Sequence, residues 1–173
     1  MAISDTAKLV LPAGTYEIDP GASTVRFDTR ASFGLLPVHG TFTISHGRIT
    51  VTESPEESSV QVVMDAASFD SGNQQRDNHV KSPDFLDVAR HPEIAFQSQS
   101  LQRSAQQASL QGELTACGTT HPVLVAINTV ACEDEQITAT GTATVDRFAF
   151  GVTKARGMAG RHLKITLEIV ASR

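Results

Sequence analysis

The stretch LKITLEI, residues 163–169, alternates strictly between apolar and polar side chains near the end of the chain. Its odd-numbered positions are Leu or Ile, and its even-numbered positions are Lys, Thr and Glu. This period of two is typical of a β-strand that turns one face to a core and the other to water. The same alternation recurs upstream, for example at residues 25–30 (VRFDTR) and 110–114 (LQGEL), so the pattern is not local.

Strand signals of this kind follow one another along almost the whole sequence. Turn residues separate them, including Gly34, Pro37 and the pair His46-Gly47. We count about eight or more strands with short connections and no long helical period, which favours an all-β antiparallel barrel or sandwich. The expected strands are residues 25–30, 38–44, 48–52, 60–66, a strand from 94, 110–114, 123–128, 137–145 and 163–169.

Two features favour a barrel with a hollow interior. The strands are long, and closing a barrel removes the unpaired edges that long strands would otherwise expose. The expected inward positions also include small residues, which leave space for a ligand in a barrel of about eight strands, although they also accommodate taper and bends. These small residues are Ala31, Ala66, Gly112, Ala139, Gly141 and Ala143.

Composition limits the class of protein. A chain of 173 residues, 40% hydrophobic and 19% charged, suits a single globular domain, which we place at residues 1–173. The net charge is -5 without a basic block, so a nucleic-acid partner is disfavoured. Eight Phe, one Tyr and no Trp provide few platforms for stacking bases.

The N-terminal segment and the cysteines bear on location. The apolar run at residues 9–11 is too short for a signal peptide, and no stretch approaches the roughly 20 apolar residues of a membrane-spanning helix. Cys117 and Cys132 lie on two arms of an expected hairpin that turns at residues 118–120. At about 3.3 Å per residue they are too far apart for a disulfide. We therefore expect free thiols and a cytoplasmic protein.

The densest polar cluster lies in one connection, residues 74–98. Asn73 is a plausible N-cap, which predicts helical turns over residues 74–80 with Arg76 and His79 on one face and Asp77 adjacent. Ser82-Pro83 looks like a second helix start, so the helical segment is expected near residues 73–88. The cluster fits two interpretations: a polar site at the mouth of the barrel, or an ion-pair network that pins a lid.

Other chemistry finds little support in the sequence. The six histidines show no metal-binding spacing, and no G-x-S-x-G elbow is present. Cys117 would need a histidine beside it to act as a nucleophile, and a small buried residue at a strand end is the stronger interpretation. We predict no metal and no cofactor.

The stretch from Arg76 to Ser98 resembles a known family pattern. The run RDNHV-KS, then DFLDV, a proline and IAFQS is similar to the characteristic segment of the YceI-like family. Other segments agree in order: residues 16–19 with 23–27, VHGTF at 38–42, GELT at 112–115 followed by Gly118 and HPV at 121–123, and DRFAFG at 146–151. The resemblance covers nearly the whole chain.

The resemblance implies a lipocalin-like antiparallel β-barrel around an elongated apolar tunnel. Members are similar to polyisoprenoid-binding proteins that hold prenyl chains, quinone-like tails or other lipids, and no catalytic mechanism is attached to the family as a whole. The chain departs from the pattern at Ala22, where a histidine is common, at Cys117, where a basic residue is usual, and at His91, where an aromatic is usual. These departures bear on which head group the ligand is expected to have, and they bear less on the fold.

We therefore predict a non-enzymatic protein that binds, stores or transports a long-chain isoprenoid or other lipid, and the prediction leaves room for a homodimer. Arg76 and His79 are expected at the polar end of the tunnel. The alternative is a small-molecule hydrolase or isomerase with Asp77 and His79 as an acid/base pair inside the barrel. The expected tunnel lining is Phe27, Phe42, Val62, Met64, Phe85, Phe96, Leu114, Val125 and Phe148.

Overall fold

The computed structural model describes residues 11–104 and 107–173. Most of the N-terminal segment used above to argue against a signal peptide, residues 1–10, lies outside the described residues. Residues 105–106, between the expected strand from 94 and the expected strand at 110–114, also lie outside them.

Strands dominate the described part of the chain, as the alternation predicts. One α-helix and two short 3-10 helices lie in the connections. In chain order the elements are β1 (Gly14–Ile18), β2 (Thr24–Ala31), β3 (Leu36–Val51), η2 (Pro55–Glu57), β4 (Ser59–Asp70), α1 (Gln74–Lys81), β5 (Glu93–Arg103), β6 (Ala108–Ala116), β7 (Thr119–Glu133), β8 (Gln136–Asp146), η3 (Arg147–Phe150) and β9 (His162–Ser172).

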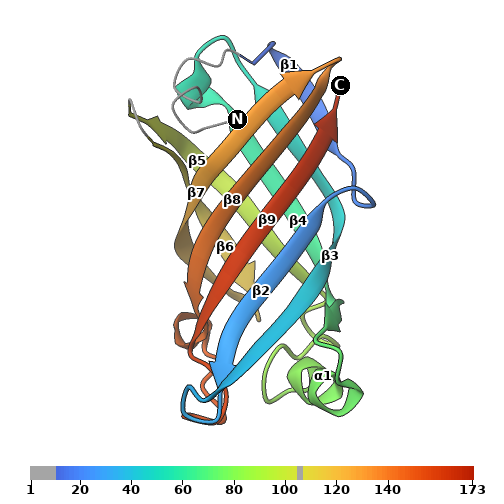
Figure 1. The fold of residues 1–173 in the computed structure, drawn as a ribbon, viewed down its shortest axis with the longest axis vertical. Coiled ribbons are helices and arrows are strands. Elements are labelled where there is room, and N and C mark those ends of the chain that lie inside the picture. The colour runs from blue at the N-terminus through green and yellow to red at the C-terminus, as the bar shows by residue number, and fades with distance from the viewer. Residues whose placement is uncertain (1–10, 105–106) are drawn as a thin grey trace.

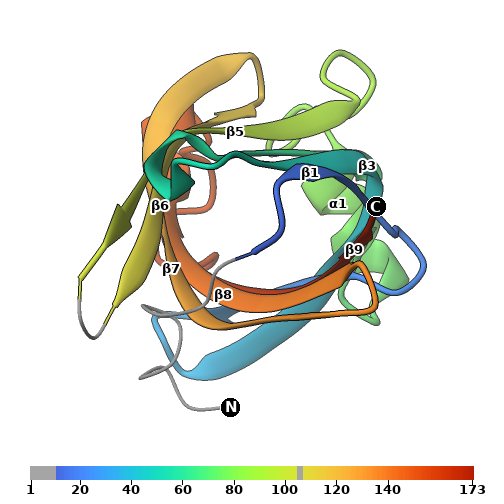
Figure 2. The ribbon, with the colours of Figure 1, turned by 90° about the horizontal axis from the view of Figure 1, so that it is seen from above.

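The strands close into one antiparallel barrel (Figures 1 and 2). The order is β1-β3-β2-β9-β8-β7-β6-β5-β4, and the pairing of β3 with β4 completes the circle. The short β1 pairs with both β3 and β9, beyond the point where β2 pairs with the same two strands. β1 and β2 therefore share one position, and eight strand positions surround the interior. The prediction of an antiparallel barrel of about eight strands is confirmed.

The predicted turn at His46-Gly47 is wrong, because β3 runs through it as one strand of 16 residues. The pairing with β4 slips between Ile44 and His46, which marks a bulge rather than a reversal. A Cβ atom on Gly47 would lie 2.7 Å from Ile18 Cδ1 and 2.8 Å from the Gln61 carbonyl oxygen. Glycine is needed here because two neighbouring strands approach closely.

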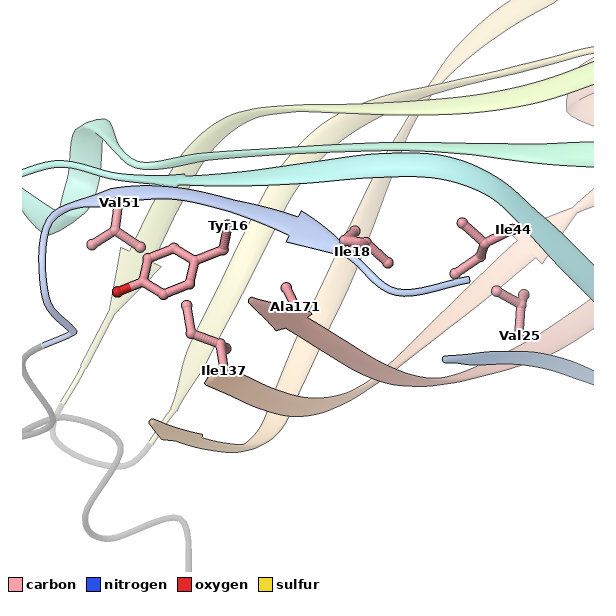
Figure 3. Close-up of a cluster of buried hydrophobic side chains, with 7 residues drawn as sticks. All are labelled: Tyr16, Ile18, Val25, Ile44, Val51, Ile137 and Ala171. Carbon is pink, nitrogen blue, oxygen red and sulfur yellow. The ribbon is translucent and has the colours of Figure 1, made fainter. Parts of the chain in front are cut away.

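The two ends of the barrel differ (Figure 1). One end, the β1 end, carries β1, η2 and the C-terminus. The other, the α1 end, carries α1, the turn between β2 and β3, and the connection between β8 and β9. Toward the β1 end a cluster of buried side chains packs between β1, β2, β3, β8 and β9 (Figure 3), and Tyr16 is fully buried among them. The Tyr16 hydroxyl donates to the Pro12 carbonyl oxygen at 2.7 Å.

The helical segment is shorter than predicted. The expected N-cap is confirmed, since the Asn73 side chain accepts a hydrogen bond from the Arg76 backbone N–H at 3.0 Å. α1 ends at Lys81, and residues 82–91 form turns instead of the second helix expected at Ser82-Pro83. Asp87 takes a left-handed conformation with φ of 49°, which is incompatible with a helix continuing through this position.

Candidate functional site

A cavity of about 870 Å³ occupies the interior of the barrel. This volume lies in the upper part of the range of about 300–1,000 Å³ that is usual for ligand sites. All eight long strands contribute side chains to the lining, and the α1 end adds residues of α1 and the connections. Strands of about eleven residues, tilted by about 40°, give the barrel a length of roughly 28 Å. The cavity is therefore a long chamber rather than a compact pocket.

The alternation in the sequence correctly identifies the inner wall. The odd positions from Leu163 to Ile169 all line the cavity, as do Val123, Val125 and Ile127 of β7. The intervening Leu124 is 52% exposed on the outside. Ile165, Leu167 and Ile169 face inward yet are only half-buried. Inward side chains keep this accessible surface because the centre of the barrel is not filled by their neighbours.

The small inward residues serve two purposes, of which only one was expected. Ala31, Ala139, Gly141 and Ala143 line the cavity as predicted, whereas Ala66 and Gly112 do not. A Cβ atom on Gly112 would lie 2.5 Å from the Phe96 ring. The absent side chain of Gly112 therefore makes room for an aromatic ring that lies flat on the strand, and not for ligand.

All the predicted site residues except Phe148 line the cavity, and their contact with a ligand stays a prediction. Phe148 lies on η3, where its ring faces the guanidinium groups of Arg147, Arg156 and Arg161 at 5.0, 5.0 and 4.6 Å. Alternation fails here because β8 ends at Asp146, whose carboxylate accepts from the Phe148 N–H at 3.0 Å. The chain then follows a 3-10 turn instead of a strand.

Arg76 and His79 contribute to the lining at the α1 end. Arg76 is held by Ser71, to whose hydroxyl its Nε donates at 2.8 Å and to whose carbonyl its Nη2 donates at 3.0 Å. The His79 Nε2 lies 3.2 Å from Asp84 Oδ2, and its ring meets the Phe85 ring edge-on at 5.0 Å. Both side chains are thus positioned by groups within their own connection.

Asp77 and His79 do not form the acid/base pair of the alternative hypothesis. Asp77 is buried, and its carboxylate accepts hydrogen bonds from the Ser71 N–H at 3.0 Å and from the Ser71 hydroxyl. It is absent from the lining of the chamber, whereas His79 is part of it. Arg76 and Asp77 both bind Ser71 and so fasten α1 to the end of β4. Of the expected ion-pair network, His79 pairs with Asp84, whereas Arg76 and Asp77 form a hydrogen-bonded clasp on one serine.

A buried arginine, Arg147, is a lining residue that the sequence did not reveal as part of the site. Its guanidinium donates to the carbonyl oxygens of Gly160 at 2.8 Å, Val152 at 2.8 Å and Ala159 at 3.2 Å. Burial lowers its pKa because desolvation disfavours the charged form. The only sequence signal was its place in the DRFAFG segment, since burial of an arginine after a strand leaves no periodic trace.

Cys117 also lies in the wall of the chamber. It occupies the β6–β7 turn with φ of 53°, followed by Gly118 with φ of 74°, and its sulfur lies 3.6 Å from the carbonyl oxygens of Phe85 and Leu86. Burial, reinforced by the nearby Asp87 carboxylate, raises the pKa of the thiol. Both cysteines are free, as predicted, and the raised pKa of the Cys117 thiol disfavours the nucleophilic thiolate.

The chamber reaches the surface at both ends of the barrel. Its lining includes exposed residues at the β1 end, among them Glu53 and Arg103, and exposed residues at the α1 end, among them Arg76 and Met158. Between these ends the wall is almost wholly apolar. Of the departures from the family pattern, Cys117 lines the chamber, whereas Ala22 is exposed in the turn after β1 and lies outside the lining.

Within residues 11–104 and 107–173, no cluster of three or more His, Cys, Asp or Glu side chains could hold a metal ion. A search of the same residues found no helix with the length and hydropathy required to cross a membrane.

Comparison with known proteins gives a consistent result. A UPF0312 protein of Ectopseudomonas mendocina is 30% identical over 165 residues, covering 91% of this chain and 86% of the relative. The crystal structure of Burkholderia cenocepacia BcnA superposes with a TM-score of 0.79 at 25% identity, covering 90% of this chain and 99% of BcnA. A polyisoprenoid binding domain from Saccharophagus degradans shares the fold with a TM-score of 0.66 at 9% identity, covering 91% and 97% of the two chains.

The family model for the YceI-like domain matches residues 16–171. This match spans β1 to β9 and includes every strand of the barrel. The chain belongs to the YceI-like family.

Proposed function

We propose that this protein binds a long-chain apolar ligand, such as a polyisoprenoid, an isoprenoid quinone or another lipid, in the chamber of the barrel, and stores or carries it without chemical conversion. The observation that carries the proposal is the elongated apolar cavity of about 870 Å³ that runs through the barrel. A chain-like ligand fits this shape because it is long and has a narrow cross-section, so it can fill the chamber without displacing the wall.

The free energy of binding would come mainly from apolar burial. Each methylene group removed from water contributes about 0.8 kcal/mol, so ten methylene groups would offset much of the entropy lost on association. The half-buried wall residues would also gain, because the ligand would cover the apolar surface that they expose to the chamber. Specific polar contacts are therefore needed only to orient the head group.

The polar groups of the α1 end are suited to that orienting role. Arg76, His79 and Arg147 line this end of the chamber, and each is fixed by hydrogen bonds to the protein. Cys117, where the family usually has a basic residue, places a neutral thiol in the same region. We propose that this difference changes the preferred head group relative to other members.

The comparison with Saccharophagus degradans supports the ligand class. That structure is described as a polyisoprenoid binding domain, and it shares its fold with this chain. The cytoplasmic location and the homodimer considered above are also proposals.

The test is native mass spectrometry of the purified protein, before and after delipidation with organic solvent. We expect a co-purified hydrophobic ligand, and rebinding of a long-chain polyprenyl alcohol or fatty acid at one molecule per chain after delipidation. A protein that carries no ligand and rebinds none of these chains would contradict the proposal. Circular dichroism after delipidation confirms that the barrel is still folded.

A further inference from the structure

The α1 end of the barrel carries an exposed apolar tip that the binding chamber does not explain. Five large apolar side chains of the described residues are more than half exposed, and four of them lie at this end. The fifth, Leu124, stands alone on the outer wall. The tip consists of Phe33 (78% exposed), Leu35 (78%), Leu36 (56%) and Met158 (54%). A cluster of this kind at one end of a barrel marks an interaction site.

The tip is one structural unit, although its residues come from two distant segments. The Ser32 N–H donates to the Met158 carbonyl oxygen at 2.8 Å, and the Phe33 N–H donates to the Gly157 carbonyl oxygen. A Cβ atom on Gly157 would lie 2.5 Å from the Phe33 ring, so the ring rests on that glycine. The turn between β2 and β3 is thereby fixed against the connection between β8 and β9, and both lie at the bottom of Figure 1.

The backbone conformation of this turn does not favour a phenylalanine at position 33. Ser32 and Phe33 both have left-handed backbone conformations, with φ of 51° and 57°. Asn and Gly are the residues preferred in such turns, and a bulky residue there is an outlier. An aromatic side chain that is strained and mostly in water indicates a contact outside the barrel.

The surroundings of the tip are basic, although the chain as a whole has a net charge of -5. Residues 29–38 and 147–161 contain no Asp or Glu. Arg30, Lys154, Arg156 and Arg161 are exposed in these segments or at their ends, and Arg161 is neutralised by Asp146 at 2.9 Å. We call Arg30, Lys154 and Arg156 the basic rim. Apolar side chains flanked by cations are the chemistry that binds an anionic bilayer surface.

The tip also continues into the chamber. Met158 belongs to both, and its neighbours Ala155, Ala159 and Gly160 are part of the cavity lining. A surface docked through the tip would therefore lie next to one mouth of the apolar chamber. A polar protein partner would gain nothing from that continuity, whereas a lipid surface would supply the chain-like ligand directly.

We propose that the apolar tip and the basic rim dock this protein on the surface of a membrane that contains anionic phospholipids, with the α1 mouth of the chamber facing the lipid. The reason for docking, exchange of the bound chain with the bilayer, rests on the proposed function. The docking itself depends only on the exposed side chains and their charges, and so it can be measured in the absence of any ligand.

The experiment is co-sedimentation of the full-length delipidated protein with vesicles of phosphatidylcholine alone and with added phosphatidylglycerol. We expect binding to the anionic vesicles, weakened by salt. Phe33→Asn/Leu35→Ser should abolish binding, because it removes the inserted side chains. The Asn suits the left-handed position, so this variant should fold. Leu124→Ser removes an exposed leucine outside the tip and should bind as the wild type does.

The basic rim is tested by Lys154→Gln/Arg156→Gln, which should weaken binding by roughly 25-fold, or about fivefold for each cation near an anionic surface. Arg26→Gln/Arg48→Gln removes the same charge from the outer wall and should have a much smaller effect. Absence of vesicle binding, or equal binding by the tip variant and the wild type, would overturn the proposal. So would a tip variant that instead converts a dimer to a monomer in analytical ultracentrifugation, because the tip would then be a contact between two copies.

The tip variant should still rebind a polyprenyl alcohol in vesicle-free solution. This measurement separates the two proposals. Loss of vesicle binding with retained binding of the polyprenyl alcohol is the result expected if the tip acts in docking alone. Failure of the wild type to bind the polyprenyl alcohol in solution would count against the chamber as a binding site and not against docking.

Discussion

The two ends of the barrel are built on different principles. At the β1 end, strands run to the edge, and apolar side chains such as Tyr16 and Ile137 pack between them with almost no exposed surface. At the α1 end, the connections are held in place by hydrogen bonds from side chains to backbone, most clearly those of Arg147. The strands therefore supply the apolar wall of the chamber, and the polar groups that would distinguish ligands under the proposed function lie in segments without periodicity.

The largest effect is expected at the β1 end. Tyr16→Ala should lower the free energy of unfolding by about 3–5 kcal/mol, because it removes a large, fully buried side chain. Urea unfolding measures this loss. Tyr16→Phe removes only the hydrogen bond to Pro12 and should cost about 1 kcal/mol. If Tyr16→Ala cost less than about 1 kcal/mol, this cluster would not be what stabilises the end.

The corresponding change at the α1 end is Arg147→Met. It leaves three carbonyl oxygens without their donor, and we expect a loss of about 3 kcal/mol in the free energy of unfolding. Arg156→Met, which changes an exposed arginine of the same connection, should cost no more than about 0.5 kcal/mol. Equal effects of the two substitutions in thermal or urea unfolding would show that the buried hydrogen bonds do not organise this end.

The chamber itself is tested by Ala139→Phe, which adds a ring to the inner wall. If the ring displaces three methylene groups of ligand, binding should weaken by about 2.4 kcal/mol, or roughly 50-fold. Ala126→Phe places the same ring on the outer face of the neighbouring β7 and should leave binding unchanged. Fluorescence titration with a fatty-acid analogue measures both. Unaltered binding by Ala139→Phe would place the ligand outside the barrel.

Cys117 reports on occupancy near the α1 end. Because burial and Asp87 raise the pKa of its thiol, alkylation should be slow at neutral pH and should continue to accelerate above the usual pH range of thiols. A bound chain should slow it further. Cys132, which lies outside the cavity lining, serves as the internal comparison in peptide mass mapping. Equal protection of both cysteines would indicate general stiffening and not occupancy.

The smallest effect concerns acid stability. The hydrogen bond from Arg161 lowers the pKa of Asp146 from 3.8 to about 2, so folding favours the charged carboxylate. Its contribution is present above about pH 4 and is lost as the pH falls to about 2. Asp146→Asn should flatten the decline of stability in this window, and the effect should be modest because the pair is near the surface. Parallel pH profiles of unfolding for variant and wild type would contradict this.

The wall was predictable from the sequence because a period of two assigns each residue to one face. The segments from Val60 to Met64 and from Leu163 to Ile169 line the cavity as the alternation indicated. Exceptions arise where a residue packs closely against a neighbour that is distant in the sequence. Gly47 looked like a turn but accommodates Ile18, and Gly112 looked like empty space but lies under Phe96.

The α1 end was less predictable because its connections follow no regular period. The N-cap of α1 is local and was found, whereas the partners of Asp77, Arg147 and Phe148 depend on the irregular path of the connection that holds each of them. No spacing along the chain encodes that Arg147 binds the carbonyl groups of Val152, Ala159 and Gly160, or that Phe148 turns toward arginines rather than toward the chamber.

The most direct test of the chamber is a crystal structure of the delipidated protein soaked with a long-chain fatty acid that carries bromine at the end of its chain. We expect an anomalous peak inside the barrel, within contact distance of wall residues such as Val125, Ile165 and Leu167. A bromine found only on the outer surface, or a barrel interior closed by repacked side chains, would contradict the account.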